Sequence, residues 1–108
     1  TPGHTPGCLS YIFPVKENGK EYIAALFGGA TPPWNSAEGQ EQFKKSVKHF
    51  EQATKEKNVT VALSNHTAFD QGIERIEYSK NRYSYMPNIY ILGQSGFQKF
   101  MKVYENLS

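Results

Sequence analysis

The 108-residue chain has one cysteine, no long apolar run and a small net charge, and each of these features excludes a class of protein. A single cysteine, Cys8, excludes any disulfide within the chain, so cysteine usage indicates neither an oxidising nor a reducing compartment. No apolar run approaches the roughly 18–20 residues that cross a bilayer, so we expect no membrane span. The net charge of +2, from 12 basic and 10 acidic residues, is too small and scattered to indicate nucleic acid binding.

Histidine is also scarce, and one of the three histidines has an unusual setting. His4 lies in the opening run 1–7, where two prolines fix φ and two glycines permit tight turns. A rigid loop of this kind fixes the position of the imidazole, as a metal site requires. The alternative is a surface turn with an incidental histidine, and spacing alone does not decide between them. Cys8 follows this loop, and we expect it to be a small buried strand residue.

Strand patterns dominate the first quarter of the chain. The runs 9–15 and 21–27 are rich in aromatic and aliphatic residues, and the pair Asn18-Gly19 between them is favoured in hairpin turns. Pro14 cannot donate a ladder hydrogen bond, which predicts an unpaired edge or a bulge at that point. The unbroken apolar end of the second run indicates burial on both sheet faces.

A loop and a long helix are predicted next. The glycines and prolines of 28–33 indicate a loop, with Trp34 exposed beside it. Asn35 or Ser36 can cap a helix that reaches about Lys57, because apolar residues recur there at helical spacing. These residues are Phe43, Val47, Phe50 and Thr54. His49 lies beside this stripe, and we expect it to be a solvated residue.

The second half predicts one short strand and two further helices. The strand 59–63 ends in Ser64-Asn65-His66, and loops at strand ends are where ligands gather in layered folds. A helix over 69–78, with Phe69, Ile73 and Ile76 as its apolar anchors, and a short apolar connection over 89–92 are expected. Ser95 with Gln98 forms a capping box for a terminal helix, whose apolar stripe we assign to the core. The stripe contains Phe97, Phe100, Met101, Tyr104 and Leu107.

Three motifs together resemble the metallo-β-lactamase superfamily over most of the chain. They are the loop Gly3-His4-Thr5-Pro6-Gly7-Cys8, the strand end Leu26-Phe27-Gly28-Gly29, and Leu63-Ser64-Asn65-His66. The third subclass of these lactamases is the most similar. In the first subclass a zinc-binding cysteine follows the Gly-Gly strand end, whereas the third subclass lacks it, and here Ala30 stands in that place. The resemblance implies an α+β fold of layered α/β type: the C-terminal half of an αββα sandwich, with one sheet and flanking helices.

The resemblance also implies a zinc site. A Gly-His-Thr-Pro-Gly histidine binds the first zinc in that family and a later histidine binds the second, which assigns His4 and His66 to two zinc ions of an intact protein. The family's His-x-His-x-Asp-His motif, which provides the other ligands, has no counterpart here. The chain also starts within a motif and without methionine. We therefore expect residues 1–108 to be a C-terminal half-domain whose missing N-terminal half is a partner, with partial or no zinc occupancy by itself.

The activity implied for the intact protein is hydrolysis of a lactam, ester or thioester by metal-activated hydroxide, with this segment inactive alone. Thr5 and Asn65 are candidates for orienting the imidazoles, and Ala30, Thr31 and Trp34 for the side that meets a small-molecule substrate. The third subclass is expected to hold the carboxylate of the drug with serines at the segment that reads Gly29-Ala30-Thr31-Pro32 here, so the sequence departs from it where lactam recognition is concerned.

A different class of function stays open: a non-catalytic module that binds a small molecule or a partner and retains only the scaffold. In either case one sheet face would lack its partner sheet, which predicts self-association. A lactamase-like parent would be periplasmic or secreted. Neither nucleic acid nor a membrane is an expected partner.

Overall fold

A β-hairpin forms most of the sheet in the computed structural model, which describes residues 1–107. β1 (Tyr11–Glu17) pairs antiparallel with β2 (Lys20–Leu26). Asn18 and Gly19 have φ values of 50° and 78°, as a hairpin turn with two positive-φ residues requires. The predicted hairpin is confirmed, and Pro14 is accommodated because β1 is an edge strand.

The third strand is parallel to the hairpin's second strand. β3 (Val61–Leu63) pairs with β2 in parallel and gives the sheet order β1-β2-β3. Ala24 and Ala25 are 0% and 2% exposed, so the central strand is buried on both faces as its unbroken apolar run predicted. Ile91 makes only an isolated bridge to Val61, which agrees with the short connection expected there.

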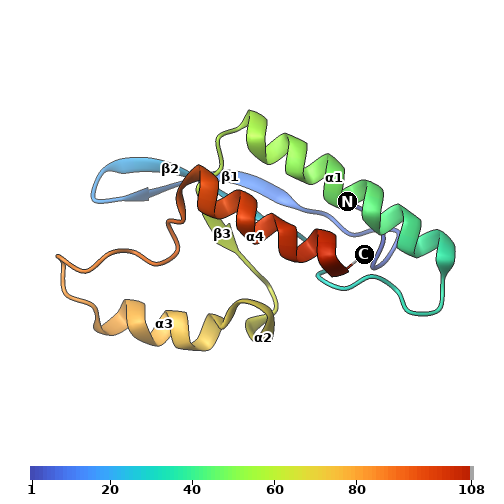
Figure 1. The fold of residues 1–108 in the computed structure, drawn as a ribbon. Helices are drawn as coiled ribbons and strands as arrows, with labels where there is room; N and C mark the ends of the chain where they lie inside the picture. Colours follow the sequence, from blue (N-terminus) through green and yellow to red (C-terminus); the bar gives the residue numbers. More distant parts are fainter. Residues whose placement is uncertain (108) are drawn as a thin grey trace.

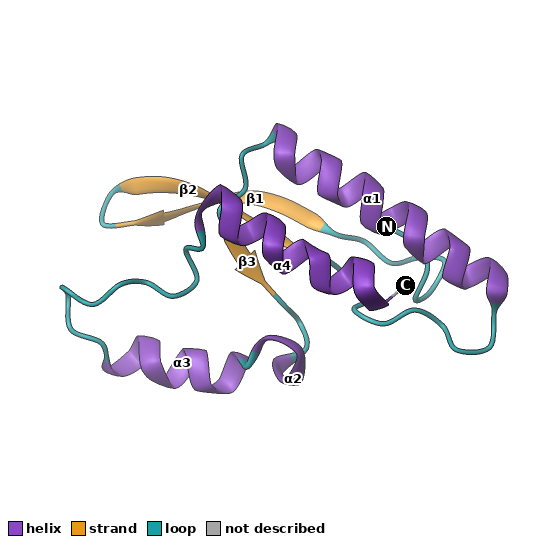
Figure 2. Cartoon of the chain, in the orientation of Figure 1, coloured by secondary structure: helices purple, strands orange, loops and turns teal. Residues whose placement is uncertain are grey.

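Two long helices cover one face of the sheet side by side (Figures 1 and 2). α1 (Ala37–Glu56) is capped by Ser36, whose Oγ accepts a 2.9 Å hydrogen bond from the Gly39 N–H. The predicted stripe of α1 is buried, and His49 is exposed as expected. α4 (Gly93–Leu107) packs against α1 and β3. No helix among residues 1–107 is long and apolar enough to cross a membrane.

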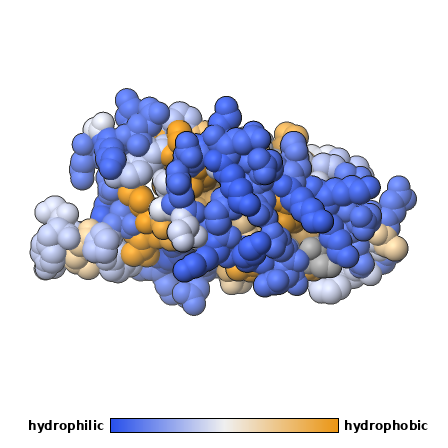
Figure 3. Space-filling view, turned by 45° about the horizontal axis from the view of Figure 1, so that its top comes forward, coloured by the Kyte–Doolittle hydropathy of each residue, from blue (hydrophilic) through white to orange (hydrophobic). Residues whose placement is uncertain are grey.

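Aromatic rings join the sheet to both helices. The Phe27 ring centroid lies 5.8 Å from that of Phe43 and 5.4 Å from that of Phe50, both on α1. It lies 4.8 Å from the Tyr104 ring of α4. Burying such a side chain contributes about 1.5–3 kcal/mol, so this cluster is a major part of the core. The outer face over these helices is mostly hydrophilic (Figure 3).

The structure corrects the predicted single helix over 69–78. The chain forms α2 (Thr67–Asp70) and α3 (Gly72–Asn81), divided at Gln71, which has a φ of 55°. The left-handed residue breaks the helix, and Ile73 and Ile76, the expected apolar anchors, are 61% and 50% exposed. α3 lies apart from the α1–α4 pair (Figure 1).

Two local predictions are also wrong. α4 begins at Gly93, before Ser95, so Ser95 lies in the first turn and does not cap the helix. The reason is that the Leu92 N–H donates to the Thr60 carbonyl at 2.7 Å, and Gly93, with a φ of 74°, turns the chain directly into the helix. Cys8 is a half-buried loop residue before β1 and not a buried strand residue, because the first strand starts only at Tyr11.

Candidate metal centre

One edge of the sheet collects the loops that carry the two candidate histidines. Tyr11 at the start of β1 pairs with Leu26 at the end of β2, and Leu26 pairs with Leu63 at the end of β3. The loop before β1 and the loop after β3 therefore leave the sheet at the same edge. His4 lies in the first loop and His66 in the second, and both are exposed.

A backbone contact orients the His4 imidazole. Its Nδ1 lies 2.7 Å from the Thr31 carbonyl oxygen and 3.2 Å from the Thr31 hydroxyl. The carbonyl can only accept, so this bond requires the proton on Nδ1, and in a neutral imidazole the lone pair is then on Nε2. A neutral imidazole in this tautomer has the form that a zinc ligand needs.

Close packing against α1 holds the His4 loop in place. A Cβ on Gly3 would lie 2.6 Å from the Phe43 Cα, so only glycine permits this approach to the helix. The Ser46 hydroxyl donates to the Pro2 carbonyl at 2.6 Å, and Ser46 is itself buried. His4 therefore lies in a loop that is anchored to a long helix.

The strand end after β2 forms the other wall of this loop. Gly29 has a φ of 74°, and a Cβ there would lie 2.7 Å from the His4 Cβ and 2.9 Å from the Cys8 Sγ. Thr5, a candidate for orienting the imidazole, instead places its hydroxyl 3.2 Å from that Sγ. The polar contact to His4 comes from Thr31. Sequence spacing had no signal for this pairing because the two residues lie in separate loops.

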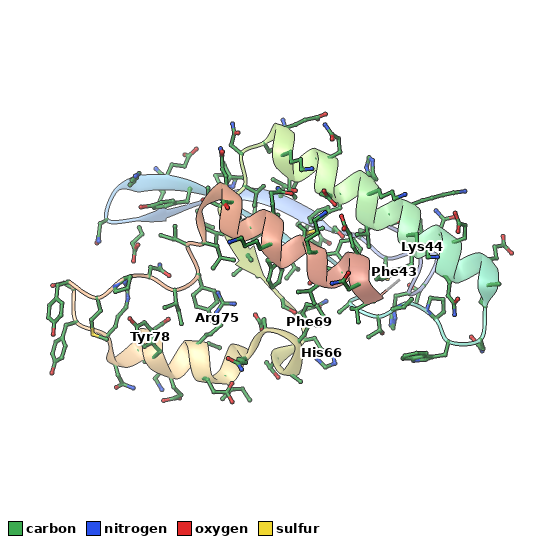
Figure 4. All side chains as sticks on the ribbon, viewed as in Figure 1. Phe43, Lys44, His66, Phe69, Arg75 and Tyr78 are labelled. Atoms are coloured by element: carbon green, nitrogen blue, oxygen red, sulfur yellow. The ribbon has the colours of Figure 1, made fainter. Side chains whose placement is uncertain are left out.

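His66 begins a short helix beyond β3. It is the N-cap residue of α2, and its backbone N–H donates to the Ser64 Oγ at 3.1 Å, while Asn65 is exposed between them. His66 and Phe69 lie close to each other beside α2 (Figure 4). The His66 imidazole makes no capping hydrogen bond, so the ring is not held at the helix end.

Ring stacking and an ion pair attach α2 to the rest of the molecule. Phe69 stacks on Tyr104 of α4, with centroids 4.9 Å apart and planes at 28°. Asp70 pairs with Arg75 at 3.4 Å, and their side chains are only 5% and 15% exposed. Arg75 also donates to the Ile89 carbonyl at 3.0 Å (Figure 4). Sequence analysis missed the contacts of Phe69 with Tyr104 and of Arg75 with Ile89, since they join segments distant in the chain.

A solvent-open hollow adjoins His4 on the α1 side. Its volume is about 600 Å³, in the range of small-molecule sites. Ala30, a candidate for the substrate side, is instead 7% exposed and part of the core, whereas Trp34 is 87% exposed. The residues that line the hollow are Pro2, Gly3, His4, Pro6, Pro33, Ser36, Glu38, Gly39 and Gln42.

The donor set fits part of a zinc site. Catalytic zinc takes three protein ligands, and a two-metal site takes more. Within residues 1–107 no group of three or more histidine, cysteine, aspartate or glutamate side chains could hold a metal ion. What these residues offer is two exposed imidazoles, one of which has its tautomer set by a backbone carbonyl.

Comparisons with known proteins identify the fold. No family model matches the sequence, and no curated protein matches it. Among solved structures, the chain is similar to the Rm3 metallo-β-lactamase, with a TM-score of 0.67 and 18% identity, over 99% of this chain and 40% of that one. It is also similar to BJP-1, a subclass B3 metallo-β-lactamase of Bradyrhizobium japonicum, with a TM-score of 0.65 and 20% identity, over 99% of this chain and 43% of that one.

The chain matches only part of each solved structure. The chain spans about two-fifths of the length of these solved structures, and nearly all of it superposes on them. The predicted α+β class is confirmed by the three-stranded sheet and its helices. The chain therefore has the fold of part of a metallo-β-lactamase, in agreement with the C-terminal portion that its motifs resemble.

Proposed function

We propose that this chain is the C-terminal half-domain of a zinc-dependent hydrolase, in which His4 and His66 supply one imidazole to each of two zinc ions. The main support is the His4 imidazole, whose Nδ1 bonds the Thr31 carbonyl, so that the neutral ring would carry its free lone pair on Nε2. Further support is that the loops of both histidines leave the same edge of the sheet. The remaining ligands would come from a preceding segment.

The chemistry divides between the metal and the chain. When bound, two zinc ions supply a water-derived nucleophile at neutral pH and stabilise the negative charge that develops on the attacked oxygen. The chain's own task is positioning: Thr31 holds the proton on the His4 Nδ1, and the tight contact of Gly3 with α1 limits movement of the loop. Hydrolysis by the segment alone is not expected, because two imidazoles do not complete a catalytic zinc site.

The substrate class is an ester, a thioester or a lactam. Of these, a lactam bearing a carboxylate has the least support, because the segment Gly29-Ala30-Thr31-Pro32 contains no serine to bind that group. Ala30 is buried, and the Thr31 hydroxyl is already engaged with His4. The hollow beside His4 is a suitable place for a small organic substrate.

Zinc titration of the isotope-labelled chain tests the ligand assignment. We expect the imidazole resonances of His4 and His66 to shift with added zinc, while those of His49, exposed on α1, provide the internal control. The variants His4→Ala and His66→Ala should each remove one response, and His49→Ala should remove neither. Equal responses from all three histidines would contradict the assignment.

A binding module without catalysis is the second candidate, favoured by the hollow and by the incomplete donor set of residues 1–107. Measurements on a longer protein that includes preceding sequence would distinguish the hydrolase from the binding module. Two zinc ions per chain and turnover of nitrocefin or a thioester are expected for the hydrolase. A purified, folded protein that holds no zinc and turns over neither compound would favour the binding module.

A further inference from the structure

α3 is attached to the molecule in an unusual way for a helix. Of its ten residues, all of them described, only Gly72 is buried. Its two isoleucines, Ile73 and Ile76, are 61% and 50% exposed, so α3 lacks the buried apolar stripe that normally holds a surface helix. Because α3 directly follows α2, the contacts that hold α3 also affect the segment that begins at His66.

The guanidinium group of Arg75 supplies the missing attachment. Its Nη1 donates to the Asp70 Oδ2 at 3.4 Å, and its Nη2 donates to the Ile89 carbonyl at 3.0 Å. The Arg75 Cζ also lies 4.2 Å from the centroid of the Tyr90 ring, which is a cation–π contact. The side chain is only 15% exposed and extends from α3 toward the connection 89–92 (Figure 4). One side chain therefore joins the end of α2 to that connection.

The connection 89–92 is in turn fixed to the sheet. Ile91 forms an antiparallel bridge with Val61, the first residue of β3. His66 lies beyond the other end of the same strand. The chain that leaves β3 through His66 and α2 is thus tied back to β3 by Arg75, and the His66 segment is closed into a loop that begins and ends at one strand.

We propose that Arg75 is a positioning residue for His66. It holds Asp70, the last residue of α2, and so fixes the orientation of the helix that His66 begins. A helix of four residues has little stability of its own, so its geometry depends on outside contacts. Phe69 provides the apolar contact by stacking on Tyr104, and Arg75 provides the polar one. The importance for zinc rests on the proposed function, whereas the restraint on α2 does not.

Arg75→Ala in the full 108-residue chain tests the proposal without metal. We expect the NMR order parameters of the 66–70 amides to fall from about 0.85, the value of rigid backbone, toward about 0.6, while those of β2 stay unchanged. The reason is that α2 then keeps only its apolar contact. A variant that is less stable in urea but keeps rigid order parameters at 66–70 would show that Arg75 only stabilises the fold, and would overturn the proposal.

Arg82 provides a matched control. It donates to the Met86 carbonyl at 2.9 Å and pairs with Glu17, so it makes the same two kinds of polar contact as Arg75, beyond the other end of α3. Its side chain is 23% exposed. Arg82→Ala should leave the order parameters of 66–70 in place. Equal loosening of 66–70 by both variants would show that any disturbance of α3 has this effect, and would contradict a specific role for Arg75.

Two conservative variants keep the proposal testable if Arg75→Ala does not fold. Arg75→Lys retains the charge but lacks the planar fork that reaches a carboxylate and a carbonyl together, so we expect partial loosening of 66–70. Asp70→Asn removes the charge that Arg75 binds and should also loosen 66–70, with a smaller added effect in the Arg75→Lys background. Unchanged order parameters in both single variants would overturn the proposal.

Titration with zinc alone then separates this proposal from the proposed function. In Arg75→Ala, or in Arg75→Lys if the alanine variant does not fold, we expect a weaker zinc response at His66 and an unaltered response at His4. If neither histidine of the unmodified chain responds to zinc, the ligand assignment fails, and the order parameters still decide the positioning role. Equal loss of response at both histidines would instead overturn a role specific to His66.

Discussion

Alanine in place of Gly29 should destabilise the protein and disturb His4 at the same time. Gly29 has a φ of 74°, a conformation that costs an L-residue about 1–2 kcal/mol. The added Cβ would also lie 2.7 Å from the His4 Cβ and 2.9 Å from the Cys8 Sγ, so at least one of them must move. Overpacking of this kind costs about 1–3 kcal/mol, which gives a total near 2–5 kcal/mol.

Gly19 provides a matched control for this prediction. Its φ of 78° is nearly the same, but a Cβ there meets nothing within 4 Å. Gly19→Ala should therefore cost only the backbone contribution, about 1–2 kcal/mol. The difference between the two variants isolates the contact with the His4 loop.

Urea unfolding and imidazole NMR measure the two effects. We expect Gly29→Ala to lower the free energy of unfolding by more than Gly19→Ala does, and to shift the His4 ring resonances, which Gly19→Ala should leave in place. A domain of this size has a total stability of about 5–15 kcal/mol, so the loss should be large enough to measure. Equal destabilisation by the two variants, with unmoved His4 resonances, would refute the packing argument.

Three further predictions concern the core, the uncovered surface and one ion pair. Phe27→Ala should cost about 3–5 kcal/mol in urea unfolding because it empties the centre of the aromatic cluster, whereas Trp34→Ala, at an 87% exposed side chain, should cost little; similar costs would contradict the assigned core. The isolated chain should self-associate through the sheet face opposite α1 and α4, where Tyr11 is 52% exposed; sedimentation showing a monomer at all concentrations, together with no apolar dye binding, would argue against it. Arg82 beside Glu17 holds the pKa of that carboxyl below its ordinary 4.5, so the ion pair stabilises the fold above that pH and the stabilisation is lost as pH falls through the lowered value. Glu17→Gln should accordingly be less stable than the unmodified chain at neutral pH and approach it in acid, and a gap that stays constant with pH would show that the pair is not responsible.

Local signals in the sequence were sufficient for some elements and insufficient for others. The Asn18-Gly19 turn and the Ser36 cap depend on groups close along the chain, and both formed as predicted. The break between α2 and α3 was missed, because the apolar spacing there continues through Gln71, where the backbone becomes left-handed. A Cβ on the following Gly72 would lie 2.9 Å from the Asp70 Oδ1, and Arg75 bonds the other oxygen of that carboxylate.

The candidate site divides in the same way. The sequence by itself singled out His4 and His66 as candidates and indicated the turn chemistry around the first of them, since proline, glycine and strand patterns act over a few residues. Only the tertiary structure decided that Thr31 contacts the His4 imidazole and that Tyr104 of α4 stacks on Phe69 of α2. Those contacts join separate loops and helices, and strand pairing and core packing, rather than spacing along the chain, determine which of them meet.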